Sequence, residues 1–281
     1  MSAPNRQSQA PTGNWTKATG SFRRPPIGNL LQTARIDHGP AAVLGRFLLA
    51  ANEAALSRGV SLSFATFDEL WRANEKNRDT WNRIPTIFDP EFCGEQLQPD
   101  RAFVILGKNA DGDVVVSQAC KLMDLGDRSI GDALLSQHVF FDNPDLDRLP
   151  DEKIEVTAQS AFKVKGRVSV GGAAWCRPDY RGRHLPALTS RLGRAISLAH
   201  WNVDYYVSFF VEKVALGGVA KDVGFDRGEW HMKLENARAG NAKTYFVWVD
   251  PDEIVVDLAR HSAEINVGSA QVDGRVLDRG A

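Results

Sequence analysis

One short basic stretch of this chain contains the residues that could act together to bind a ligand. Arg181-Gly182-Arg183 lies between a predicted strand, residues 168–176, and a predicted amphipathic helix, residues 185–200. The backbone N–H groups of a first helical turn have no partners inside the helix and point outward at the positive end of its dipole. A pyrophosphate placed there meets several donors, and the two arginines can add charge-assisted hydrogen bonds. Gly182 lets the backbone approach a ligand closely. The stretch therefore indicates a site for a phosphorylated ligand.

The elements around this turn are predicted to alternate between strand and helix. Downstream, residues 203–211 read as a β-branched and aromatic strand, and a short helix over 213–223 ends at Gly224-Phe225. Two further strands (230–234 and 244–249) and a last helix from Asp250 through Arg260 follow. Upstream the expected elements are a helix over 40–58, a strand over 60–64, a helix over 67–81 that Thr66 and Glu69 begin with a capping box, and a hairpin over 101–122.

The chain has 281 residues, which suits one large domain with elaborated ends. We expect a flexible N-terminal arm over residues 1–38, a single domain over 39–262 and a C-terminal tail over 263–281. Within the domain, residues 124–166 form an acid-rich insertion, and so long a connection is usually functional or carries elements of its own.

This order of elements resembles the GNAT superfamily of N-acetyltransferases over roughly residues 60 to 250, less the insertion. In that family an Arg/Gln-x-x-Gly-x-Gly/Ala turn holds the pyrophosphate of acetyl-CoA, and residues 178–183 look like its lead-in. Gly224-Phe225 looks like the pair that closes the family's fourth helix. The resemblance implies an α/β (α+β) fold with a mixed, mostly antiparallel central sheet flanked by helices. This chain would add an N-terminal helical extension and an insertion before the fourth strand.

The turn departs from the family pattern at two positions. Counting from Arg181, the first glycine position holds His184 and the Gly/Ala position holds Pro186, which removes one backbone donor. The family often has a tyrosine four residues before the glycine of the Gly-Phe pair, where it acts as general acid; this chain has Ala220 there. Lys213 stands near the position of a frequent asparagine.

The resemblance implies acyl transfer in which a neutral amine attacks a thioester carbonyl. A backbone N–H near residues 174–176 would polarise that carbonyl, and Trp175 would face outward and line the acyl or acceptor cleft. Glu212, at the end of the next strand, and Glu155, in the insertion, are the candidate general bases, with a solvated surface carboxylate as the competing interpretation of each. The residues expected to bind the cofactor are Cys176, Arg177, Arg181, Gly182, Arg183, His184, Leu185 and Ala187.

The composition of the chain argues against several classes of binding partner. The net charge of -1 argues against a protein whose main task is to bind nucleic acid. Residues 1–26 lack the apolar core of a signal peptide, and no run is apolar enough to span a membrane, so we expect a cytoplasmic protein without a membrane partner. Three widely spaced cysteines argue against both a disulfide framework and a structural zinc site, and no metal is expected.

The expected function is that of a CoA-dependent N-acyltransferase, with acetyl-CoA or another acyl-CoA as co-substrate and a small-molecule amine or a peptide as acceptor. Three alternatives stay open. The first is a long-chain acyltransferase that uses an acyl carrier protein. The second is a non-catalytic GNAT-like binding module, and the third is a nucleotide-binding protein of another α/β type. A homodimer is compatible with each of them.

Overall fold

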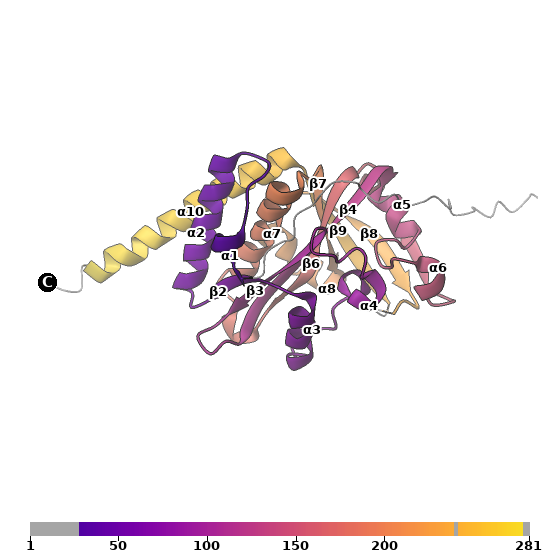
Figure 1. Ribbon diagram of the computed structural model, residues 1–281, viewed down its shortest axis with the longest axis horizontal. Helices are drawn as coiled ribbons and strands as arrows, with labels where there is room; N and C mark the ends of the chain where they lie inside the picture. The colour runs from indigo at the N-terminus through magenta and orange to yellow at the C-terminus, as the bar shows by residue number, and fades with distance from the viewer. Residues whose placement is uncertain (1–27, 239–240, 278–281) are drawn as a thin grey trace, which may run out of the picture.

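The computed structural model describes residues 28–238 and 241–277, and these residues form one nine-stranded sheet with helices on both of its faces (Figure 1). The sheet order is β1-β2-β3-β4-β6-β7-β9-β8-β5. The strands are β1 (Gly28–Asn29), β2 (Ser61–Ala65), β3 (Ala102–Lys108), β4 (Val114–Ser129), β5 (Lys153–Val156), β6 (Lys165–Cys176), β7 (Tyr205–Val211), β8 (Gly228–Glu235) and β9 (Ala242–Val249).

All neighbouring strands pair antiparallel except β6 and β7, which run parallel. A parallel pair needs a crossover connection, and the helix α7 (Leu185–Trp201) supplies it. The mixed, mostly antiparallel sheet flanked by helices that the sequence predicted is therefore confirmed. The insertion before β6 is confirmed as well, and it carries α5 (Ile130–Leu135), α6 (Pro144–Asp147), the edge strand β5 and the 3-10 turn η2 (Gln159–Phe162).

The two faces of the sheet bury two separate apolar cores. Along β3 the side chains alternate, so that Phe103 and Ile105 join one cluster while Val104 and Leu106 join the other. The first face, which we call the α7 face, is covered by α2 (Ala41–Ser57), α7 and α10 (Pro251–Leu277). The second, the α3 face, is covered by α3 (Phe67–Lys76), η1 (Thr86–Phe88), α4 (Pro90–Cys93), α5 and η2.

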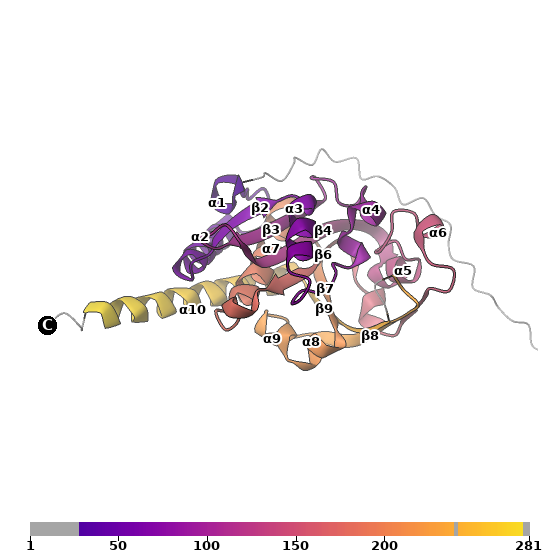
Figure 2. The ribbon, with the colours of Figure 1, turned by 90° about the horizontal axis from the view of Figure 1, so that it is seen from below.

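The helix α7 is more deeply buried than an amphipathic helix should be. Its apolar stripe was predicted, but Arg191 and Arg194 on its other side are also buried. Both guanidinium groups bind the carboxylate of Asp257 on α10, at 2.9 Å and 3.1 Å, because α10 covers the side of α7 that would otherwise meet water. Figure 2 shows α10 extending to the left, beyond the body of the protein.

Both ends of the predicted domain needed correction. The arm was predicted to reach residue 38, yet Gly28–Asn29 pairs with β2, and the short helix α1 (Leu30–Thr33) buries Leu30 completely. From residue 28 onward the chain is thus part of the fold, while residues 1–27 lie outside the described residues. The last helix was predicted to stop at Arg260, with a tail after it, but α10 continues to Leu277.

Several other element bounds differ from prediction for local reasons. The Thr66–Glu69 capping box begins α3 as expected, but α3 ends at Lys76 rather than Trp81. The helix predicted over 213–223 is two short helices, α8 (Glu212–Leu216) and α9 (Val219–Asp222), because Gly217-Gly218 interrupts it and Gly218 has a φ of 76°.

Among the described residues, no helix is long and apolar enough to cross a membrane.

Candidate functional site

The parallel strands β6 and β7 separate partway along their length. They pair from Val168↔Tyr205 to Gly171↔Ser208, and beyond that point no register joins them although both strands continue. The hydroxyl of Ser208 donates to the carbonyl of Gly171 at 2.9 Å, at the last paired position. Beyond Gly171, no described strand therefore pairs with the edge of β6 that faces β7, so the backbone N–H groups that point to this edge have no ladder partner among the described residues.

A β-bulge in β6 accompanies this separation. Ser117 and Ala119 of β4 pair with Trp175 and Gly172, so β6 holds one extra residue, and Ala173 there has a φ of 49°. The bulge shifts the alternation of side chains and places Trp175 on the α3 face. Trp175 is only 7% exposed and stacks on Trp81 with ring centroids 4.6 Å apart. The expectation that it faces outward is wrong, because Trp81 covers it, while its indole N–H has no partner among the described residues.

The predicted phosphate turn lies at the carboxyl end of β6. It contains the 3-10 turn η3 (Pro178–Tyr180) and leads into the first turn of α7, where no side chain makes a capping hydrogen bond. Gly182 has a φ of 79°, and a Cβ at this position would meet no atom within 4 Å, so the backbone is bare there. His184, at the first family glycine position, takes the left-handed conformation with a φ of 57° and is exposed.

The three arginines of this turn differ in the partners that already engage them. Arg177 is held by Asp179 at 2.7 Å and by Asp113 at 3.4 Å. Arg183 lies over the ring of Tyr180, 4.1 Å from its centroid, and donates to the carbonyl of Arg58 at 3.3 Å. Arg181 is exposed and has no ion-pair partner among the described residues. Of the three, Arg181 is therefore the cation that remains available to a phosphate.

The remaining predicted cofactor contacts are buried around the turn. Leu185 packs in the core of the α7 face and Ala187 is buried, so only their backbone N–H groups can serve a ligand. Cys176 is buried as well, and burial raises the pKa of its thiol to about 11. A thiol in that state is not a nucleophile at neutral pH.

The two predicted bases lie at the ends of a surface row of charges. Glu155 on β5 stands opposite Lys233 on β8, which stands opposite Lys243 on β9, whose ammonium lies 3.5 Å from Glu212. Glu212 and Glu155 are both exposed. Three strand spacings separate β5 from β7, or about 14 Å. The structure therefore does not bring Glu155 to the diverging strands, while Glu212 directly follows β7 but is engaged with Lys243.

The Gly224-Phe225 pair has a structural explanation. Gly224 has a φ of 89°, and a Cβ there would lie 2.6–2.9 Å from the side-chain atoms of Arg191, Arg194 and Asp257. The carbonyl of Gly224 also accepts a hydrogen bond from Arg194 at 2.9 Å. Ala220, at the position of the family's acid, is buried and offers no proton donor.

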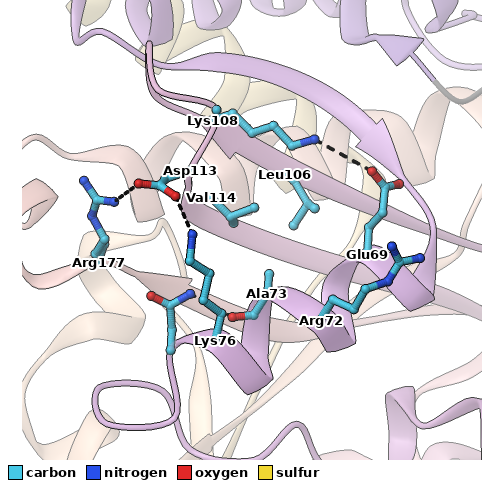
Figure 3. A pocket seen from close by; sticks show the side chains of 11 residues that line it. Glu69, Arg72, Ala73, Lys76, Leu106, Lys108, Asp113, Val114 and Arg177 are labelled. Atoms are coloured by element: carbon cyan, nitrogen blue, oxygen red, sulfur yellow. Dashed lines mark hydrogen bonds and ion pairs between the residues drawn. The ribbon is translucent and has the colours of Figure 1, made fainter.

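A pocket of about 270 Å³ opens on the α3 face beside the same turn (Figure 3). The figure shows Asp113, from the β3–β4 hairpin, held between Lys76 of α3 and Arg177. These contacts join the turn to α3, and neither Lys76 nor Asp113 was predicted as a site residue. Within the described residues, no group of three or more His, Cys, Asp or Glu side chains is placed to hold a metal ion.

A buried histidine near the diverging strands was also missed. His231 on β8 is 1% exposed. Its ring stacks on Phe209 at a centroid distance of 5.3 Å and lies tilted by 30° against Phe246 at 4.8 Å. The sequence showed only a strand at this position, with no motif around the histidine. Its burial results from a bulge between Trp230 and Met232, which no local pattern signals.

Solved structures to which this chain is similar include three with comparable coverage. A variant of spermidine N-acetyltransferase from Vibrio cholerae has 8% identity and a TM-score of 0.41, with 70% of this chain and 96% of that chain covered. A ribosomal-protein-S5-alanine acetyltransferase from Vibrio fischeri has 9% identity and a TM-score of 0.39, with 69% and 94% covered. An uncharacterized protein from Bacillus halodurans has 12% identity and a TM-score of 0.43, with 73% and 92% covered.

The strand order and register of the chain itself agree with the GNAT-like fold that the sequence predicted. They comprise an antiparallel run from β2 to β6, the parallel β6/β7 pair with its α7 crossover, and the β8/β9 hairpin. No protein-family model matches the chain, and no curated protein matches it in sequence.

Proposed function

We propose that this protein is an N-acyltransferase that moves an acyl group, acetyl in the simplest case, from acyl-CoA to an amine acceptor in the cytoplasm. One observation carries the proposal. The bare turn at Gly182 and the uncapped start of α7 lie at the carboxyl end of β6, on the same strand whose edge is freed by the separation from β7.

The arrangement supports a direct transfer in three respects. Arg181 and the first backbone N–H groups of α7 would bind the pyrophosphate of the acyl donor. The unpaired edge of β6 beyond Gly171 offers backbone N–H groups that would stabilise the negative charge developing on the thioester oxygen. The amine would approach from the α3 face, where Trp175 lies. Pro186 removes one backbone donor from the turn, and neither Pro186 nor His184 closes it, because His184 is exposed and Gly182 stays open.

Calorimetric titration with acetyl-CoA and with CoA tests the proposal. We expect micromolar binding, about -8 kcal/mol, for the wild type and at least a tenfold loss for Arg181→Glu. Arg46→Glu is the matched control, since Arg46 is an exposed arginine on α2 about 18 Å along that helix from Arg58, which contacts the turn. If neither ligand binds the wild type, or if both variants lose affinity equally, the assignment of the turn is wrong.

A carrier-protein-bound acyl donor is a second candidate. Val211 and Leu216 are exposed apolar side chains at the carboxyl end of β7, with the exposed Lys213 between them. An apolar patch beside a cation suits docking of an acidic carrier domain. Under this alternative, acyl carrier protein would bind the chain and CoA would not.

A further inference from the structure

His231 is an unusual residue for the interior of a protein. Neither of its ring nitrogens has a hydrogen-bond partner among the described residues, although the side chain is only 1% exposed. Burial lowers the pKa of its imidazole to about 4. The ring is therefore neutral at neutral pH, and one of its nitrogens carries an unused lone pair.

The ring lies next to the place where β6 and β7 part. Phe209, on which it stacks, directly follows Ser208, the last residue of β7 that pairs with β6. Phe209 and Phe246 both belong to the core of the α3 face, so His231 reaches the diverging strands from that face. Its position is set by the bulge in β8, where His231 is the extra residue between two paired positions.

Two other buried polar groups without partners among the described residues lie on strands of the sheet and belong to the same face. One is the indole N–H of Trp175 on β6, and the other is the hydroxyl of Thr244 on β9, two residues before Phe246. Buried polar groups in native proteins are almost always hydrogen-bonded, and each exception calls for an explanation. The three exceptions lie on β6, β9 and β8, on the face from which the ring of His231 contacts Phe209 of β7, and they indicate that this face of the sheet is built to meet polar atoms of a ligand.

We propose that His231 takes the proton from the acceptor amine during acyl transfer, a role that rests on the function proposed above. The amine nitrogen attacks the thioester carbonyl carbon, forming the C–N bond, and a ring nitrogen of His231 accepts the amine proton. The C–S bond then breaks, and the departing CoA thiolate takes that proton from the imidazolium. The products are an amide and a thiol, and His231 returns to its neutral state.

Glu229 is the competing base on the same strand. It stands opposite Phe246, two residues before His231, but its carboxylate already accepts a hydrogen bond from the backbone N–H of Ser160 at 3.4 Å, and its side chain is partly exposed. His231 has no such partner. The two residues are therefore a matched pair for mutation.

The test compares His231→Gln, His231→Phe and Glu229→Gln with the wild type in three measurements. These are the Kd of acetyl-CoA by calorimetry, the release of CoA thiol with 2-phenylethylamine or water as acceptor, and the Tm. We expect the Kd to stay within twofold for all variants, and kcat to fall about 100-fold for both His231 variants but not for Glu229→Gln. His231→Phe keeps the ring stacking and removes the unpaired nitrogens, so its Tm should rise by about 2–4 °C.

The outcomes separate this inference from the function on which it rests. A wild type that does not bind acetyl-CoA, or binds it and releases no thiol, overturns the proposed function and the inference with it. A wild type that binds and reacts while both His231 variants keep kcat within twofold overturns the inference alone. So does a loss of kcat in Glu229→Gln only, or a loss in the His231 variants that comes with a lower Tm in both, since that would mark a structural role.

Discussion

At the scale of single residues, polar side chains that already have an ion-pair partner hold the fold, whereas those without one remain available to a ligand. Arg177 and Arg181 are four residues apart in the same basic turn, yet Arg177 is fixed by two carboxylates and Arg181 by none among the described residues. A side chain already engaged in a bidentate ion pair must lose that pair before it can bind a phosphate. The free residue is therefore the better test of ligand binding than its neighbour.

Protonation of His231 should make stability depend on pH. The pKa of its imidazole is lowered from 6.5 to about 4 in the fold, so between those values the unfolded chain binds more protons than the folded one. The contribution of this pKa difference to the free energy of unfolding is complete above pH 6.5 and is lost as pH falls toward 4. It amounts to about 2 kcal/mol between pH 7.5 and pH 5.

Urea denaturation of the wild type and His231→Phe at both pH values isolates this effect. Other groups titrate in the same range, but they are shared by the two proteins and cancel in the difference. The free energy of unfolding of His231→Phe, relative to that of the wild type, should rise by about 2 kcal/mol on acidification. If this difference in free energy did not change with pH, the imidazole would not be buried in the way the structure shows.

At the scale of elements, the buried carboxylate of Asp257 joins α7 to α10. It binds Arg191 and Arg194, and the side chain of Arg194 is only 1% exposed. Asp257→Ala would leave that guanidinium buried without a counter-charge, which should lower the free energy of unfolding by about 3–5 kcal/mol. Arg260→Ala, which removes the solvent-exposed third partner of the same carboxylate, should cost less than about 1 kcal/mol. Equal losses in urea denaturation would contradict this account.

The segment after residue 27 offers a second test at this scale. Leu30 on α1 is completely buried in the core of the α7 face, so Leu30→Ala should cost about 2–4 kcal/mol of unfolding free energy. Gln32 lies on the same short helix and is exposed, and Gln32→Ala should stay within about 0.5 kcal/mol. A Leu30→Ala protein as stable as wild type would mean that this segment is a loose arm after all.

The elements that the sequence predicted well are those with strong local signals. The Thr66–Glu69 capping box, the hairpin over 101–122 and the strand–turn–helix around Gly182 each depend on residues close together in the chain. The docking of α1, the full burial of α7 and the length of α10 depend on contacts between distant segments, which periodicity does not report. For the same reason the turn could be predicted as a site, whereas the bulges that position Trp175 and His231 could not.

At the scale of the whole molecule, the sheet divides the protein into two sides that meet where β6 and β7 part. The α7 face carries the helix whose first turn would bind the acyl donor, and the α3 face carries Trp175, Phe209 and the cover formed by α3 and the residues after it. A ternary complex built this way would receive its two substrates from opposite faces. Damage to one side should then leave binding on the other side intact.

Trp81→Phe tests this division, because Trp81 covers Trp175 on the α3 face at a ring distance of 4.6 Å. The smaller ring should loosen Trp175 and raise the KM of the acceptor amine about tenfold, or roughly 1.4 kcal/mol, while the Kd of acetyl-CoA stays within twofold. Arg181→Glu should do the reverse, raising the Kd of acetyl-CoA at an unchanged KM for the amine. In the double variant, the KM of the amine and the Kd of acetyl-CoA should each change by the same factor as in the corresponding single variant. If Trp81→Phe weakened the binding of acetyl-CoA as much as it weakened that of the amine, both substrates would share the α3 face and the division would fail.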